Sequence, residues 1–351
     1  MVNIENKSVV LLKYPTEYPV AGEHIDVQYK EFDPTLAEGQ VLLRNLYISL
    51  DPYLRGRMNR AQNSYIPSYK INESLDSPGI AEVIESKNPK YPVGSIVTGP
   101  SIQWEERTVV DANRPLTILP RKAEHPNIPL SAHIGVLGMP GFTAHGSLLS
   151  IGKPKAGETI FISAASGAVG QLVGQIAKLK GLRVVGSAGS DDKVDFLLNE
   201  LKFDAAFNYR KAGTTILESL RAAAPEGVDI YYENVGGETL DAALEVMNAH
   251  GRIVVCGMIS QYNTGGGANG YGLKNSINIL AKRLTIQGFL VVEFGPEMHE
   301  QFTKDVTEWL SKGEIVYKED IAVGLDAAPE KFAGLFHGTN FGKGVIKIAD
   351  L

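Results

Sequence analysis

Short apolar runs separated by proline and glycine characterise the first part of the chain. Residues 8–12, 40–44 and 95–98 are each rich in apolar side chains, and the turn signals at 51–52 and 77–79 lie between two of these runs. Runs this short, at such close spacing, are typical of β-strands joined by turns. The pattern predicts an antiparallel barrel or sandwich rather than strand–helix–strand units.

From residue 157 onward the hydrophobic pattern alternates. Residues 159–163 indicate a buried strand, and the apolar positions after it recur about every 3.6 residues, which indicates a helix that ends at Gly181. The alternation continues with strands at 183–186, 205–208, 228–232, 252–256 and 284–292, and helices at 191–201, 215–224, 238–249 and 297–312. This order predicts an α/β fold with a Rossmann-type, doubly wound parallel sheet.

The segments that join and follow these two patterns are less regular. Residues 126–146 form a glycine-rich apolar stretch that we interpret as a boundary helix. Residues 344–348, near the end of the tail that starts at residue 318, indicate one more strand. The chain is therefore expected to form two domains, with a boundary near residue 130.

The segment 164–170 lies between a predicted strand and a predicted helix. A dinucleotide-binding turn needs small residues there, because the backbone must approach the pyrophosphate and offer it helix-terminal N–H groups. Gly167 and Gly170 occupy the later glycine positions, and Ala164 replaces the first. A tight strand-to-helix turn without a ligand is the alternative, but the surrounding strand and helix favour a nucleotide site.

The end of the next strand indicates which nucleotide is bound. An NAD site usually offers an acidic residue here to the ribose 2′-hydroxyl, whereas this chain has small residues followed by Lys193. Room and a cation suit the 2′-phosphate of NADPH. In the alternative interpretation Lys193 lies on a solvated helix face with Asp191 and Asp192 as charge partners, and these acids would also repel a phosphate.

Composition narrows the possible functions. The chain has 34 Lys and Arg against 40 Asp and Glu, a net charge of −6, and lacks the basic clusters that bind nucleic acids. No apolar stretch approaches the ~18 residues of a membrane span, and we expect no secretory signal. The single cysteine, Cys256, excludes an intrachain disulfide and fits a reducing cytoplasm.

Metal chemistry is not expected. One cysteine excludes every zinc site with two or more thiolates, and the seven histidines are dispersed along the chain. Cys256 closes an apolar strand, so we interpret it as a small buried side chain.

Two tyrosines are candidate hydrogen-bond donors to a substrate. Tyr262 follows a strand end of the parallel sheet, where loops supply ligand contacts. A tyrosine hydroxyl, with a reference pKa near ~10, is protonated at neutral pH and can donate to an oxyanion. An exposed loop tyrosine without a role is the alternative, and Tyr53, after the turn at 51–52, is less specific still.

Taken together, these residues resemble the zinc-independent medium-chain reductases, specifically the NADPH-dependent alkenal/enone double-bond reductases related to leukotriene B4 12-hydroxydehydrogenase and prostaglandin reductase. The resemblance covers nearly the whole chain and runs through residues 45–55, 138–144, 164–170, 189–193, 207–209, 233–237, 256–262 and 338–343. It implies a GroES-like β-barrel domain over 1–130 that is completed by 318–351, and a Rossmann domain over 131–317. It also implies a homodimer.

The same resemblance implies a set of site residues, arranged by the part of NADPH that they contact. They are Gly167, Ala168, Val169 and Gly170 at the pyrophosphate, Gly189 and Lys193 at the 2′-phosphate, Tyr209 and Asn234 at the adenosine and ribose, and Cys256, Gly257, Met258, Ile259, Ser260, Gln261, Tyr262, Phe289, Leu290, Val291 and Asn340 at the nicotinamide half. Tyr53 and Tyr262 would face the substrate. The chain departs from the family at Leu54, Gly56 and the glycine-rich loop 265–272, which we expect near the substrate opening.

The expected reaction reduces the carbon–carbon double bond of an α,β-unsaturated aldehyde or ketone, a small-molecule substrate. Hydride goes to the β-carbon, and Tyr262, alone or with a cofactor ribose hydroxyl, stabilises the charge that builds on the carbonyl oxygen. The α-carbon proton comes from Tyr262 or from water. An NADPH:quinone oxidoreductase of the same superfamily and a non-catalytic NADPH-binding protein are the rival interpretations, and the Tyr53 and Tyr262 pair favours the enzyme.

Overall fold

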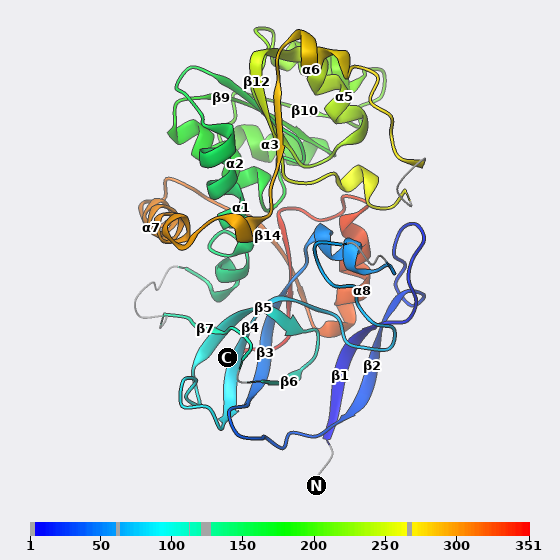
Figure 1. The fold of residues 1–351 in the computed structure, drawn as a ribbon, viewed down its shortest axis with the longest axis vertical. Coiled ribbons are helices and arrows are strands. Elements are labelled where there is room, and N and C mark those ends of the chain that lie inside the picture. The colour runs from blue at the N-terminus through cyan, green and yellow to red at the C-terminus, as the bar shows by residue number, and fades with distance from the viewer. Residues whose placement is uncertain (1–3, 61–63, 112, 121–127, 265–268) are drawn as a thin grey trace. The chain divides into compact units, whose positions relative to one another are not determined.

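The computed structural model describes residues 4–60, 64–111, 113–120, 128–264 and 269–351 (Figure 1). The chain divides into two compact units, one made of residues 1–135 and 319–351 and the other of residues 136–318. The predicted boundaries, 130 and 317, differ from these by a few residues. Within the described residues, no helix has the length and apolar composition that crossing a bilayer requires.

The first unit is built on β-strands. A seven-stranded sheet has the order β14-β15-β3-β4-β5-β7, with β6 paired to β3, and a separate antiparallel ribbon joins β1 to β2. The tail therefore adds β15 directly to β3, and β14 pairs with the other side of β15. The strands are β1 (Ile4–Leu11), β2 (Ile25–Phe32), β3 (Val41–Ser49), β4 (Asp76–Ser86), β5 (Ile96–Gln103), β6 (Arg107–Val110), β7 (Thr117–Ile118), β14 (Glu319–Val323) and β15 (Lys343–Lys347).

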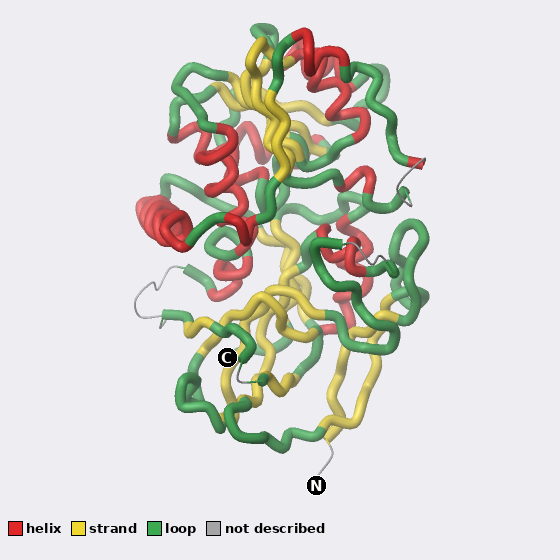
Figure 2. Tube along the Cα trace, viewed as in Figure 1, coloured by secondary structure: helices red, strands yellow, loops and turns green. Residues whose placement is uncertain are grey.

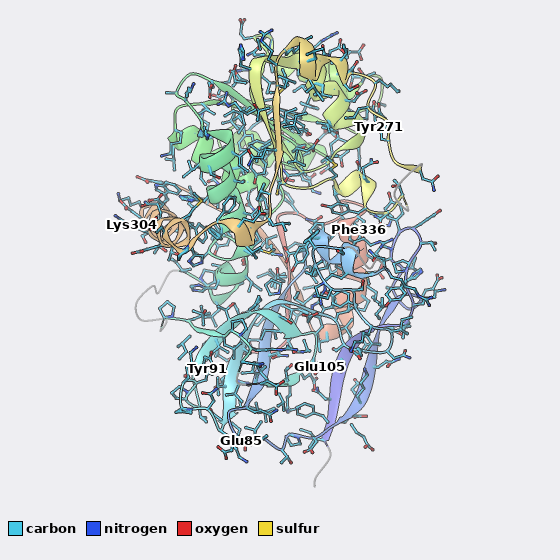
Figure 3. All side chains as sticks on the ribbon, viewed as in Figure 1. Glu85, Tyr91, Glu105, Tyr271, Lys304 and Phe336 are labelled. Atoms are coloured by element: carbon cyan, nitrogen blue, oxygen red, sulfur yellow. The ribbon has the colours of Figure 1, made fainter. Side chains whose placement is uncertain are left out.

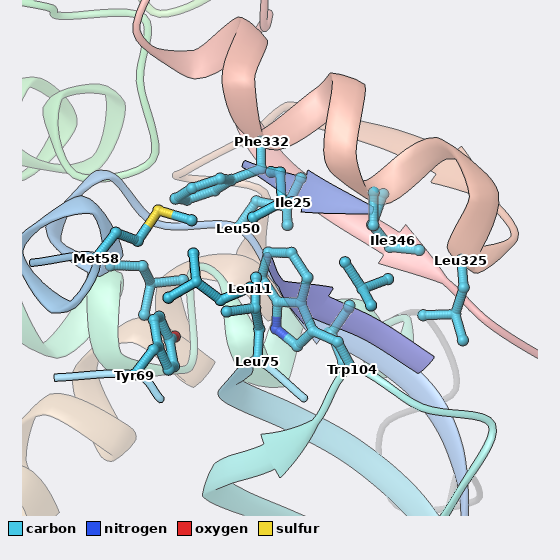
Figure 4. Close-up of a cluster of buried hydrophobic side chains, with 14 of the residues drawn as sticks. Leu11, Ile25, Leu50, Met58, Tyr69, Leu75, Trp104, Leu325, Phe332 and Ile346 are labelled. Carbon is cyan, nitrogen blue, oxygen red and sulfur yellow. The ribbon is translucent and has the colours of Figure 1, made fainter. Parts of the chain in front are cut away.

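A hydrophobic core cluster of this unit forms around Trp104 (Figure 4). Trp104 is fully buried, packs edge-on to Phe332 with ring centroids 5.7 Å apart, and donates its indole N–H to Ser77 Oγ at 2.8 Å. Burial of an aromatic side chain such as Phe332 contributes about 1.5–3 kcal/mol. Phe332 lies on α8 (Ala328–Leu335), so the tail contributes both strands and core side chains to this unit.

The second unit is a six-stranded parallel sheet with helices on both faces (Figure 2). Its order is β10-β9-β8-β11-β12-β13. The chain therefore adds β9 and β10 on one side of β8, and then crosses over to add β11, β12 and β13 on the other side. The carboxyl ends of β8 and β11 form the switch point where doubly wound sheets bind ligands. The strands are β8 (Thr159–Ile162), β9 (Arg183–Ala188), β10 (Ala205–Asn208), β11 (Val228–Glu233), β12 (Met247–Val255) and β13 (Thr285–Gly288).

Apart from the short helix α6, which was not predicted, the helices of the second unit follow the predicted order. The fold class predicted from the sequence, with a parallel Rossmann sheet and a separate N-terminal sheet domain, is confirmed. The helices are α1 (Met139–Ser147), α2 (Gly170–Leu179), α3 (Asp191–Asn199), α4 (Ile216–Ala223), α5 (Gly237–Val246), α6 (Ile277–Ala281) and α7 (Pro296–Lys312).

Three predicted boundaries were wrong. The strand expected over 284–292 ends at Gly288, because Gly288 pairs with Val255, the last residue of the neighbouring strand β12. The helix expected over 238–249 ends at Val246, where β12 begins. Within the described part of the expected boundary helix, a 3₁₀ turn (Leu130–Ile134) is separated from α1 by the non-helical residues 135–138.

Candidate functional site

The turn from β8 to α2 is shaped by close backbone contacts. Ala164 has a positive φ of 48°, and the N–H of Gly167 donates to Ala164 O at 3.0 Å. A Cβ atom on Gly170 would lie 2.7 Å from Ala164 O and 2.8 Å from Ala165 Cα, so only glycine fits there. The N-cap of α2, Val169, has no acceptor in its side chain, so no side chain caps the start of this helix.

The end of β9 brings Gly189, Lys193 and Tyr209 together. A Cβ on Gly189 would lie 2.9 Å from Tyr209 Oη. Lys193, in the first turn of α3, is only 8% exposed. The interpretation of Lys193 as a residue of a solvated helix face is therefore wrong. Sequence reasoning also missed Arg210, whose guanidinium lies 5.5 Å from the Tyr209 ring centroid and adds a second cation.

The two acids beside Lys193 have partners of their own. Asp191 accepts a hydrogen bond from Asn208 Nδ2 at 2.8 Å, and Asp192 accepts one from Ser190 Oγ. The Ser190 hydrogen bond, with a smaller contribution from the Lys193 charge, lowers the pKa of Asp192. Both acids are thus held by neutral donors at the start of α3.

A buried carboxylate, Glu233, organises the switch point between β8 and β11. Its Oε1 accepts hydrogen bonds from Tyr231 Oη at 2.8 Å and from the backbone N–H groups of Val235 and Gly236 at 2.6 and 2.8 Å. Its Oε2 has no hydrogen-bond partner among the described residues, and burial raises the pKa of the group. Sequence reasoning gave Glu233 no role of its own, although it lies in the segment 233–237 that carries part of the family resemblance.

Asn234 is fixed by the same network. Its Nδ2 donates to Ser163 O at 2.7 Å, and its backbone N–H donates to Ser163 Oγ at 3.0 Å. Ser163 directly follows β8, so the ends of β8 and β11 are joined by side chains as well as by the sheet. Asn234 Oδ1 is the acceptor that this arrangement offers to a ribose hydroxyl.

The segment 256–262 is held against the residues that end β11. The N–H groups of Cys256 and Gly257 donate to Glu233 O, and the N–H of Ser260 donates to Val235 O. A Cβ on Gly237, where φ is 56°, would lie 2.8 Å from Gln261 Nε2. The closely packed glycines at 236–237 therefore let the predicted nicotinamide segment lie directly on this turn.

Tyr262 follows the 3₁₀ turn η4 (Ile259–Gln261) and is half-buried. Its hydroxyl oxygen accepts a hydrogen bond from the N–H of Met258 at 3.2 Å. An N–H donor on the oxygen polarises the hydroxyl and strengthens it as a donor. The phenol is thus tied to its own segment, and its orientation is set within a few residues of the chain.

The chain that follows Tyr262 is anchored to α5. Tyr271, labelled in Figure 3, donates its hydroxyl to Asp241 Oδ2 at 3.2 Å, and its N–H donates to Gln261 Oε1 at 2.8 Å. Asp241 Oδ1 also accepts from the backbone N–H groups of Lys274 and Asn275. Residues 265–268 of the predicted substrate loop lie outside the described residues.

Phe289, Leu290 and Val291 directly follow the end of β13. Phe289 stacks on Phe294 with ring centroids 5.4 Å apart, and Leu290 N–H donates to Glu293 Oε2 at 2.9 Å. The segment is a turn at the carboxyl end of the sheet, on the same side as the other predicted cofactor residues of this unit.

Tyr53 and Asn340 belong to the first unit, whereas the other predicted site residues belong to the second. Tyr53 lies on the 3₁₀ helix η1 (Pro52–Arg57), where burial, aided by the Asp51 charge, raises its pKa and keeps it a donor. Asn340 donates to Gly342 O at 2.9 Å. Leu54, which was expected near the substrate opening, is 1% exposed within the core cluster of the first unit.

Comparison with known proteins identifies the family. A model described as the N-terminal domain of oxidoreductase matches residues 7–118, and one described as zinc-binding dehydrogenase matches residues 168–312. A zinc-type alcohol dehydrogenase-like protein of Schizosaccharomyces pombe is 45% identical over 99% of both chains. The NADP(+)-dependent 2-alkenal reductase of Nicotiana tabacum is 41% identical over 99% of this chain and 98% of its own.

A solved structure agrees with these relatives. CurA of Vibrio vulnificus, crystallised in complex with NADPH, is 38% identical, superposes with a TM-score of 0.89, and is matched over 98% of this chain and 100% of its own. The chain belongs to the medium-chain dehydrogenase/reductase family. Among its members it groups with the NADP-dependent alkenal and enone reductases, as the sequence resemblance predicted.

One of the two family descriptions mentions zinc, but the residues that the structure describes do not form a zinc site. Within the described ranges, no three His, Cys, Asp or Glu side chains come together as potential ligands. Burial raises the pKa of the Cys256 thiol to about 12, although a hydrogen bond with Tyr232 opposes this shift. A thiol of this kind stays protonated at neutral pH, whereas zinc binds the thiolate.

Proposed function

We propose that this medium-chain reductase uses NADPH to reduce the carbon–carbon double bond of α,β-unsaturated aldehydes and ketones. The observation that carries the proposal is the match, over 99% of this chain, to a relative named for NADP(+)-dependent 2-alkenal reduction. The arrangement of Gly170, Gly189, Lys193 and Tyr209 supports it, because it suits a dinucleotide that bears a 2′-phosphate.

The residues present fit NADPH along the edge of the parallel sheet. The turn at 167–170 would take the pyrophosphate, and Lys193, with Arg210, would take the 2′-phosphate. Asn234 would meet a ribose hydroxyl, and residues 256–262 and 289–291 would border the nicotinamide. The family resemblance also assigns Asn340 to the nicotinamide half. When bound, NADPH supplies the hydride that is added to the β-carbon.

The role of the chain is then to stabilise the charge that develops on the substrate. Tyr262 donates its hydroxyl proton in a hydrogen bond to the carbonyl oxygen as that oxygen becomes an enolate, and the Met258 N–H supports the phenol oxygen. Tyr53, buried enough to remain protonated, is the second donor toward the substrate.

A turnover screen tests this function against its rivals. NADPH oxidation is measured with small enals, enones, quinones and alcohols under the same conditions. The proposal predicts turnover with enals and enones. Turnover with quinones alone would favour a quinone oxidoreductase, and NADPH binding without turnover on any substrate would favour a non-catalytic protein.

Prolonged treatment with EDTA is expected to leave the turnover number unchanged. The described residues offer no set of three zinc ligands, and the Cys256 thiol is held in its protonated form. A zinc-dependent alcohol dehydrogenase treated in parallel serves as the positive control. Loss of turnover that zinc restores would contradict the metal-free mechanism.

We also propose that the protein is a homodimer in which β13 of one protomer pairs with β13 of its partner. β13 is an edge strand, and its surroundings expose large apolar side chains: Ile277 is 67% exposed, Leu280 75% and Ile286 39%. An exposed apolar edge is a template for pairing, and a two-fold axis would satisfy both copies at once.

Light scattering after gel filtration checks this assembly. The wild type is expected at twice the chain mass of 38.0 kDa, and Ile286→Lys is expected at the monomer mass because two lysines would meet across the axis. Val323→Lys makes the same change on β14, the edge strand of the other sheet, and should leave the dimer intact. A monomeric wild type, or a dimer that only Val323→Lys dissociates, would contradict this interface.

We place the protein in the cytoplasm. The single cysteine and the NADPH-dependent chemistry suit a reducing compartment. Fractionation of the source cells should recover the chain with cytoplasmic markers, and recovery in a membrane or exported fraction would contradict this placement.

A further inference from the structure

A buried ion pair joins two distant segments of the first unit. Lys343 Nζ donates to Asp51 Oδ1 at 3.0 Å and to Leu50 O at 2.7 Å. Ser49 Oγ donates to the other carboxylate oxygen, Asp51 Oδ2, at 2.5 Å. The side chains of Lys343 and Asp51 are only 3% and 6% exposed, so both charges of this pair are buried.

Stability alone does not account for such a pair. Removing two charges from water is costly, and well-packed apolar residues of similar size are often as stable or more stable. Burial lowers the pKa of Lys343, and the Asp51 charge opposes that shift. We explain this buried pair by the arrangement of the chain that its hydrogen bonds hold in place.

The ion pair joins two segments that carry predicted site residues. Asp51 is the N-cap residue of η1 (Pro52–Arg57), on which Tyr53 lies, and η1 has no side-chain cap of its own. Lys343 begins β15, three residues after Asn340, whose Nδ2 donates to Gly342 O. The N–H of Leu50 also donates to Gly344 O at 3.1 Å, so the two segments are bonded through backbone and side chains.

A second acid lies close to the pair. Glu319 is the register partner of Lys343 in β14 and accepts a hydrogen bond from Ser131 Oγ at 2.7 Å. Burial raises the pKa of Glu319, while Lys343 opposes that shift.

We propose that Lys343 and Asp51 are positioning residues, which lock the Tyr53-bearing turn to the Asn340-bearing turn so that both present a fixed geometry to the bound substrate and cofactor. This inference rests on the proposed function for the roles of Tyr53 and Asn340. Neither Lys343 nor Asp51 touches the reacting atoms in this account. Their effect passes through the orientation of η1, and misplacement of a contacting group by about 1 Å can cost 10²-fold in rate.

The test separates positioning from simple stability by comparing single and double variants. D51N and K343M each leave one buried charge without its partner, and both should lower the unfolding temperature. The D51N/K343M double variant removes both charges and should unfold near the wild-type temperature. It still lacks the hydrogen bond to Leu50 O, so kcat/KM on a small enone should remain about tenfold or more below wild type.

Controls and a second readout complete the design. R44M/E82Q removes the half-exposed Arg44–Glu82 pair of the same unit and should change neither temperature nor kcat/KM. Fluorotyrosine labelling gives a ¹⁹F resonance for Tyr53, assigned by its loss in Tyr53→Phe. This resonance should shift or broaden in D51N/K343M and stay unchanged in R44M/E82Q.

The outcomes distinguish this inference from the proposed function. A double variant that regains wild-type kcat/KM, or an unchanged Tyr53 resonance, would overturn the positioning role. A wild type without enone turnover would refute the proposed function, and the Tyr53 resonance would still decide whether the pair orients η1.

Discussion

Replacing Lys193 with methionine is expected to weaken NADPH binding about 10- to 150-fold, the equivalent of about 1.5–3 kcal/mol for a lost charge-assisted hydrogen bond. Lys193 is 8% exposed, so its stem is packed within the protein, and methionine keeps most of that packing while it removes the charge. NADH lacks the 2′-phosphate, and its affinity should change little. Fluorescence titrations with both cofactors measure the two dissociation constants.

The control for this experiment is Lys180→Met, which removes an exposed lysine at the end of α2. It changes the net charge by the same amount and should affect neither cofactor. Equal losses of affinity for NADPH and NADH in Lys193→Met would show that Lys193 acts through folding or through the overall electrostatic field of the protein. A retained preference for NADPH would instead assign the 2′-phosphate to Arg210.

Tyr262→Phe is expected to lower kcat about 10- to 100-fold on a small enone. The loss of one oxyanion donor costs about 10²–10³ in rate, and a ribose hydroxyl that shares the role reduces the effect. Because the hydrogen bond strengthens in the transition state, kcat should fall more than KM rises. Steady-state kinetics under conditions where hydride transfer limits the rate measure both constants.

The hydroxyl of Tyr262 also accepts the Met258 N–H, so its loss could loosen the segment 256–262. Tyr271→Phe provides the matched control, because it removes a hydroxyl that anchors the neighbouring chain to Asp241. Turnover by Tyr271→Phe should stay near wild type. An unaltered kcat in Tyr262→Phe would remove that residue from the mechanism.

The sequence predicted the order of most strands and helices of the parallel sheet. Each of these elements buries one or both of its faces, and that burial appears in its own local pattern of apolar residues. The run at 159–163 and the helical period after it correspond to β8 and α2, which pack against neighbours on both sides. The end of a strand can instead depend on where its neighbouring strand ends, and the local apolar pattern does not contain that information. β13 stops at Gly288 because β12 offers no partner beyond Val255, and no local signal reports that.

Some residues of the candidate site could also be predicted from the local sequence, and others could not. Gly170 could be predicted, since a strand-to-helix turn needs small residues, and the structure shows the close contact that excludes a side chain. Glu233 and Arg210 were missed because residue type alone does not report that one carboxylate is buried in a hydrogen-bond network or that one guanidinium lies over the Tyr209 ring. The pairing of Asp51 with Lys343 spans 292 residues of sequence, a separation at which residue type alone carries no information.

The central claim is hydride transfer from NADPH to the β-carbon of an enone. It is tested most directly with NADPH that carries deuterium at both C4 positions, a small cyclic enone as substrate, and mass spectrometry with NMR of the product. The account predicts a saturated ketone with one deuterium at the β-carbon. Deuterium on the carbonyl carbon of an allylic alcohol, or an unlabelled product, would contradict it.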